Sequence, residues 1–212
     1  MAVPWFREKG FPISWSLDPA INGSNAGTRA EAITDADVAD FAAAGDEISL
    51  HSYAGEVTAT MNPDQIVRDS VLAIKWIRDR GYTGSIWRSA WIQNSAPNAW
   101  AARPFFAAYA TPSSGAGLNV WPLTNPWNIS RYLLHGGSQA EIDTRFQQLK
   151  DARALDVQYT HGIHPDGTTG GADMTPAQWD YWTAKVEAGV AEGWLELTTF
   201  SRLLERSGGI VR

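Results

Sequence analysis

A short stretch, residues 45 to 53, constrains most strongly how this chain can fold. Apolar residues from Ala36 to Ala43 recur at helical spacing, and Gly45 follows them, as glycines do where helices end. Residues 47 to 50 alternate polar and apolar side chains, which is typical of a strand, and His51 comes directly after them. The sequence therefore predicts a helix leading into a strand whose carboxyl end carries a histidine. Parallel α/β proteins place their functional groups at such ends.

Helical and strand patterns also alternate along the rest of the chain. Further helices are predicted at Val3 to Lys9, Pro63 to Arg80 with Asn62 as N-cap, Gln139 to Ala154, Pro176 to Gly193 and Phe200 to Arg206. Further strands are predicted at Phe11 to Leu17, Ser85 to Arg88, Val157 to Thr160 and Trp194 to Thr198. In the helix after Asn62, the buried stripe is expected at Ile66, Val67, Ser70, Val71, Ile74 and Ile77. Strands interleaved with helices predict a mostly parallel sheet or barrel.

Composition limits the class of protein. With 212 residues, of which 44% are hydrophobic, the chain can bury a large core, and we expect a single domain over residues 1–212. The net charge of −6 and the scattered basic residues argue against nucleic acid or an anionic membrane surface as a partner. We also expect no membrane insertion, because no run of about twenty apolar residues occurs. The chain has no cysteine, which excludes disulfides and thiolate metal sites, and its eleven tryptophans suit both a core and exposed platforms.

The order of these patterns resembles the polysaccharide deacetylases of carbohydrate esterase family four, the NodB-homology domain. The stretches that carry the resemblance are "EISLHSY", a helix that begins "NPDQI", a strand that ends at Arg88, a late strand that ends at His161, and "GWLELTTFSRLLE". The resemblance implies an irregular (β/α) barrel with mostly parallel strands. It also implies a divalent metal, usually zinc, used to remove N- or O-acetyl groups from glycans.

The family's motifs match this chain only in part. His51 and Ser52 match its histidine motif, but Gly55 stands where the second metal-binding histidine is expected. Arg88 matches the family's arginine, and Ser89, Ala90 and Trp91 replace the Pro-Pro-Tyr that follows it. His161 matches the late histidine that acts as general acid, although a glycine follows it in place of an acid. Residues 125 to 128 offer no counterpart for the acidic residue of the fourth motif.

The first motif, Thr-Phe-Asp-Asp, is lacking. It gives the family its catalytic base and a metal ligand, and it precedes a helix and a strand equivalent to Phe11 to Leu17. Asp18 ends that later strand, on the face where a site would form. Two explanations stay open: a domain cut from a longer protein, or a barrel natively incomplete at its N-terminus.

These matches give a set of candidate residues. The catalytic candidates are His161 and Asp18, and the metal candidates are His51 and His164. The glycan-binding candidates are Arg88, Tyr53, Trp91 and Trp127. Each has a structural alternative: the histidines can be polar groups of strand ends and loops, Arg88 can be buried and paired, and the aromatic residues can be core.

Metal-assisted deacetylation requires three protein ligands with an open position and a carboxylate base. Of the family's metal ligands, only His51 is matched directly. The first hypothesis is therefore a domain that recognises a cell-surface or N-acetylated glycan with a degenerate metal site. Such a domain would be extracellular, envelope-associated or part of a virion, for example a phage tail. The alternative is an active metal-dependent N- or O-deacetylase, with zinc or another divalent cation bound only if the site is intact. A scaffold whose aromatic loops contact a protein is a third class.

Overall fold

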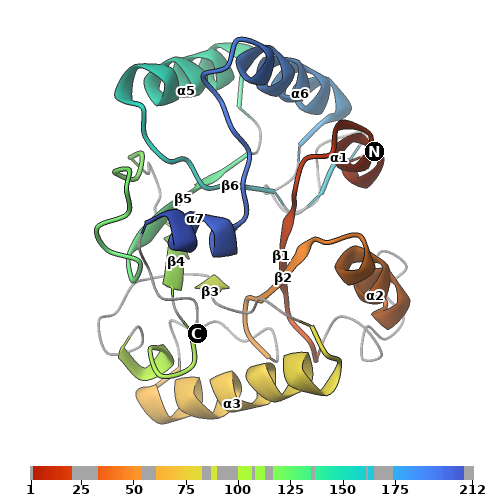
Figure 1. Ribbon diagram of the computed structural model, residues 1–212, viewed down its shortest axis with the longest axis vertical. Coiled ribbons are helices and arrows are strands. Elements are labelled where there is room, and N and C mark those ends of the chain that lie inside the picture. Colours follow the sequence, from red (N-terminus) through yellow and green to blue (C-terminus); the bar gives the residue numbers. More distant parts are fainter. Residues whose placement is uncertain are drawn as a thin grey trace. The chain divides into compact units, whose positions relative to one another are not determined.

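A computed structural model gives the fold of the chain (Figure 1). It describes residues 2–20, 33–53, 61–82, 87–89, 100–106, 108–112, 117–134, 137–160, 162–164 and 174–207. The chain divides into two compact units, each built from separate stretches of sequence. The strand unit comprises Pro12–Pro112, Pro122–Ile129 and Thr198–Arg212, and the helix-pair unit comprises Met1–Phe11, Ser113–Trp121 and Ser130–Leu197.

The strand unit contains a run of parallel strands. Its elements are β1 (Ser14–Leu17), α2 (Asp35–Ala43), β2 (Glu47–Leu50), α3 (Pro63–Asp79), β3 (Trp87–Ser89), β4 (Ala108–Pro112) and α7 (Phe200–Arg206). The strands lie in the order β1-β2-β3-β4. Each neighbouring pair is parallel, with Leu17 opposite Leu50, Leu50 opposite Arg88, and Arg88 opposite Tyr109. The predicted parallel arrangement is confirmed here, and the carboxyl ends of these strands share one edge.

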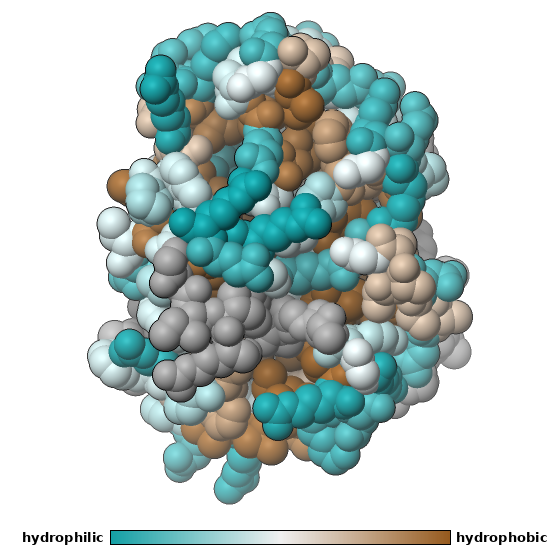
Figure 2. Space-filling model, viewed as in Figure 1, coloured by the Kyte–Doolittle hydropathy of each residue, from teal (hydrophilic) through white to brown (hydrophobic). Residues whose placement is uncertain are grey.

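The helix-pair unit is organised around two long helices. Its elements are α1 (Ala2–Lys9), β5 (Ile129–Leu133, whose first residue is assigned to the strand unit), α5 (Gln139–Ala152), β6 (Gln158–Tyr159) and α6 (Pro176–Ala191). β5 and β6 pair in parallel. The core of the unit includes Phe146, Trp179 and Trp182, and the rings of the two tryptophans stack with centroids 5.3 Å apart. On the face drawn in Figure 2, α5 and α6 show mostly hydrophilic residues outward.

Helix starts follow the sequence closely. Asn62 is the N-cap of α3 and forms a reciprocal capping box with Gln65, and Pro63 occupies the first turn as predicted. Thr175 and Ser138 cap α6 and α5 in the same way. After α2, Gly45 has φ = +85°, the left-handed backbone that glycine adopts without strain.

The buried face of α3 differs from the predicted stripe. Val67 and Val71 are 38% and 49% exposed, and the positions buried instead are Asp69, Ala73 and Trp76. A larger apolar area is removed from water when the Trp76 indole is buried than when a valine is. The Asp69 carboxylate also accepts a hydrogen bond from the Tyr53 backbone N–H at 2.8 Å. The helix is therefore rotated about its axis relative to the expectation from hydrophobic pattern alone.

One strand expectation also needs correction. Residues 194 to 198 form no strand, because the backbone N–H groups of Trp194 and Leu195 donate to the Gly189 carbonyl at the end of α6. In β2, the predicted polar positions are buried with the apolar ones: Glu47 is 5% and Ser49 0% exposed. A strand paired on both sides and covered on both faces has no solvent-facing side.

Among the described residues, no helix has the length and apolar character needed to cross a membrane.

Candidate functional site

The carboxyl ends of β1 and β2 bring two of the predicted residues together. Asp18 follows β1 and His51 follows β2, and the parallel register places Leu17 opposite Leu50 just before them. Backbone hydrogen bonds continue past the strands: the His51 N–H donates to the Leu17 carbonyl at 2.8 Å, and the Ala20 N–H to the Tyr53 carbonyl at 2.7 Å. Both loops are therefore held in register where the site candidates lie.

Asp18 is the centre of this cluster. Its Oδ1 lies 3.1 Å from His51 Nδ1, and it accepts hydrogen bonds from the Ser52 backbone N–H at 2.8 Å and from Ser52 Oγ at 2.7 Å. The side chains of Asp18 and His51 are 20% and 19% exposed, so the pair is largely but not fully shielded from water. Ser52 is completely buried.

The charge of Asp18 is stabilised by these contacts. Burial by itself raises the pKa of the Asp18 carboxyl, but the hydrogen bond and charge of His51 and the hydrogen bonds from Ser52 outweigh it. The resulting pKa lies below the ordinary value of an aspartate. An ionised Asp18 is an acceptor only, so the proton between the two groups sits on His51 Nδ1, and Nε2 is the nitrogen that a neutral His51 offers as an acceptor or ligand.

Two aromatic candidates of the strand unit contact the core. The side chains of Tyr53 and Trp127 are partly buried and pack against the cluster that contains Leu17, Leu50 and Ile66. The Arg103 guanidinium lies 5.6 Å from the centroid of the Trp127 ring. Both residues thus have a structural role, and both keep part of their surface in solvent.

The other candidates lie elsewhere. Arg88 is in β3 opposite Leu50 by its backbone, and its side chain lies outside the described part of the structure. His161 and Trp91 are also outside the described residues. His164 belongs to the helix-pair unit, where its backbone N–H donates to the Met174 carbonyl at 2.9 Å. The structure therefore unites Asp18 with His51, and the grouping of the remaining candidates stays a prediction.

Two residues of the cluster were not singled out as site candidates. Ser52 supplies two of the hydrogen bonds to Asp18, and Asp69 on α3 holds the Tyr53 backbone. The sequence carried a signal for Ser52, a small hydroxyl directly after a strand-end histidine. It carried none for Asp69, because a charged residue inside an amphipathic helix is ordinarily assigned to the solvent side.

The described residues do not complete a metal site. Asp18 and His51 could each be a ligand, but within the described ranges no group of three or more histidine, aspartate or glutamate side chains is gathered that could hold an ion. A catalytic zinc requires three protein ligands. The described donors therefore do not fit a catalytic metal.

Comparison with known proteins places the fold. No family model matches the sequence. No curated protein matches it either. Solved structures that are similar to it include the following three. A protein assigned as a polysaccharide deacetylase from Mycobacterium smegmatis has a TM-score of 0.65 and 14% identity, over 97% of this chain and 75% of that one.

The names of the other two similar proteins refer to xylan. The family 4 acetyl xylan esterase from Clostridium thermocellum, in complex with a cobalt ion, has a TM-score of 0.56 and 14% identity, over 98% of this chain and 84% of that one. The Xyl-CE4 domain of a multidomain xylanase from the hindgut metagenome of Trinervitermes trinervoides has a TM-score of 0.54 and 12% identity, over 97% of this chain and 82% of that one. The chain therefore has a divergent polysaccharide deacetylase-like fold.

Proposed function

We propose that this domain recognises a cell-surface or N-acetylated glycan through a deacetylase-like cleft whose metal site is degenerate. The observation that carries the proposal is the Asp18–His51 pair at the ends of neighbouring parallel strands. Asp18 Oδ1 takes three hydrogen bonds, one from His51 and two from Ser52, so the carboxylate serves to fix the imidazole. A histidine held in this way can bind a sugar hydroxyl or acetamide group without a metal.

The similar structures support a saccharide as the ligand. The names of all three proteins refer to polysaccharide or xylan chemistry. Each of the three structures matches nearly the whole of this chain. We propose in addition that the parallel strands belong to an irregular (β/α) barrel. We also propose that the domain meets its glycan outside the cell, on a cell envelope or as part of a virion.

An active metal-dependent deacetylase is the second candidate. The observation that favours it is the direct contact between a carboxylate and an imidazole at 3.1 Å, since these are the groups that a zinc hydrolase uses. In this case Asp18, at the end of β1, would supply one of the acids that the family takes from its first motif. Further ligands would then come from outside the described residues.

Metal content and acetate release separate the two candidates. We expect the purified protein to contain little zinc and to release no acetate from N-acetylglucosamine oligomers, because each missing ligand removes a bond to the ion. Gly55→His restores the four-residue histidine spacing of the family and should raise zinc binding. Stoichiometric zinc in the unmodified protein that is lost in His51→Ala would contradict the degenerate site and favour the enzyme.

Glycan binding is tested directly on an array that includes N-acetylated oligosaccharides. His51→Ala should weaken binding to the ligand found, and Trp91→Ala should weaken it while leaving the melting temperature nearly unchanged. Unfolding of Trp91→Ala would instead identify Trp91 as a core residue. If the wild-type protein binds no glycan, the proposed function is wrong.

A further inference from the structure

A short segment of the strand unit, residues 100–106, presents aromatic and cationic groups outward. Its inner face is anchored in the core, where Ala102 is 0% and Phe106 4% exposed. On its outer face Trp100 is 65% exposed, and Arg103 is also exposed. An indole left in water at an anchored position keeps a large apolar face on which a ligand ring can stack.

Arg103 lies near two indole rings. Its guanidinium carbon is 4.9 Å from the Trp100 ring centroid and 5.6 Å from that of Trp127. A guanidinium that stacks by its face keeps its N–H donors along its edge, where they can bind a planar acceptor. In the part of the chain that the structure describes, Arg103 has no carboxylate partner.

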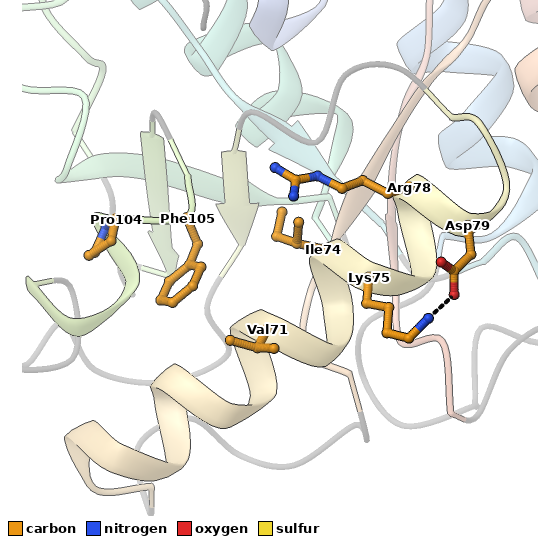
Figure 3. A pocket seen from close by; sticks show the side chains of 7 residues that line it. All are labelled: Val71, Ile74, Lys75, Arg78, Asp79, Pro104 and Phe105. Atoms are coloured by element: carbon orange, nitrogen blue, oxygen red, sulfur yellow. Dashed lines mark hydrogen bonds and ion pairs between the residues drawn. The ribbon is translucent and has the colours of Figure 1, made fainter.

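A groove begins at the residue after Arg103. Pro104 and Phe105 form one wall, and Val71, Ile74, Lys75, Arg78 and Asp79 of α3 form the other, around a volume of about 420 Å³ (Figure 3). Lys75 pairs with Asp79 at 2.5 Å, which neutralises the acid at the rim. Arg78 is exposed, and over the described ranges no ion pair engages it. The exposure of Val71, which the sequence pattern did not predict, gives the α3 wall of this groove part of its apolar surface.

We propose that Trp100, Arg103 and the adjoining groove bind an acidic polysaccharide, with a hexuronate residue at Trp100. This inference rests on the proposed glycan-binding function and names a charge class for it. The C–H face of a pyranose ring stacks on the exposed indole, and its carboxylate accepts a bidentate hydrogen bond from Arg103. The next sugar of the chain enters the groove beside Phe105, within reach of Arg78. The free cations make this surface complementary to a polyanion although the protein as a whole is negative.

The test is calorimetry of the whole protein with an oligogalacturonide and with the same oligosaccharide after reduction of its carboxyl groups. Wild type should bind the acidic form at least about tenfold more tightly, as expected for a charge-assisted bidentate contact. Arg103→Gln should abolish that preference, and Arg103→Lys should restore only part of it, because an ammonium cannot form the paired contact. Trp100→Ala should weaken binding of both forms.

Two variants serve as matched controls. Arg68→Gln removes an exposed positive charge from α3, and Trp121→Ala removes another exposed tryptophan. Both should leave the preference for the acidic form unchanged. An equal loss in Arg68→Gln and Arg103→Gln would show a general charge effect and overturn the site.

The outcomes also separate this inference from the proposed function. Equal binding of the two forms by wild type, or a preference that survives in Arg103→Gln, overturns the acidic site alone if His51→Ala still weakens binding of an N-acetylated glycan. Failure to bind any glycan overturns both. Binding of a protein partner that depends on Trp100, without saccharide binding, likewise overturns the acidic-sugar site.

Discussion

Replacement of Glu47 by glutamine should destabilise the protein by releasing its last helix. Glu47 is 5% exposed in β2, and its carboxylate accepts hydrogen bonds from Ser14 Oγ at 2.5 Å, the Phe200 N–H at 3.0 Å and the Ser201 N–H at 2.9 Å. The Ser201 hydroxyl is a further donor. The two backbone groups are the first N–H groups of α7, which no helix can pair internally.

The size of the effect follows from these contacts. In Glu47→Gln an amide NH₂ replaces one oxygen, and whichever oxygen is lost had accepted one backbone N–H and one hydroxyl. A hydroxyl can turn and accept, but a backbone N–H cannot. One buried donor left without a partner costs about 1–3 kcal/mol. Loss of the negative charge at the helix start adds about 0.3–1 kcal/mol. For a protein of this length the sum lowers the melting temperature by roughly 3–15 °C.

Thermal melting followed by circular dichroism measures this effect, and hydrogen exchange locates it. The α7 amides should exchange faster in Glu47→Gln than in wild type, while α5 and α6 keep their protection. Glu205→Gln, an exposed glutamate in α7 itself, is the matched control and should melt as wild type does. A melting temperature for Glu47→Gln within about 1 °C of wild type, with unchanged exchange in α7, would refute the reasoning.

Further predictions concern stability in both units. Asp18→Asn should lower the free energy of unfolding by about 1–2 kcal/mol at neutral pH. Because the pKa of folded Asp18 lies below its unfolded value of about 3.9, this difference from wild type should shrink as the pH falls from about 5 through the folded pKa. Arg145→Met leaves Asp156 buried without its two-bond partner and should cost about 3–5 kcal/mol in denaturant titrations. Gly189→Ala should cost about 1–3 kcal/mol, because the added Cβ would lie 2.8 Å from Trp194 Cζ2.

Arg145→Met and Gly189→Ala each have a comparison variant that should show little change. Lys150→Ala removes an exposed ion pair with Glu192 and should cost less than about 1 kcal/mol. Gly117→Ala adds a Cβ with no neighbour within 4 Å and should be tolerated. A cost for Lys150→Ala equal to that of Arg145→Met would show that burial of the Arg145–Asp156 pair is not what matters. A pH-independent difference for Asp18→Asn would show that its charge is not stabilised by the fold.

The sequence by itself determined the local structure of the chain. Asn62 and Thr175 begin α3 and α6, and Gly45 ends the turn after α2, because caps and positive-φ glycines act over a few neighbouring residues. The alternation of helices and strands predicted mostly parallel pairing for the same reason, since each crossover is a local unit, whereas the order β1-β2-β3-β4 comes from the structure. His51 and Asp18 could be assigned to strand ends from pattern alone.

Only the tertiary structure decided which polar groups are buried and with what. Glu47 finds its partners at Phe200 and Ser201, more than a hundred residues away, and Asp18 finds His51 across 33 residues. The rotation of α3, which buries Trp76 and exposes Val71, likewise depends on what the neighbouring strands offer. Hydrophobic periodicity records that one face is buried, but a polar residue in the pattern is buried only when a distant donor or acceptor satisfies it.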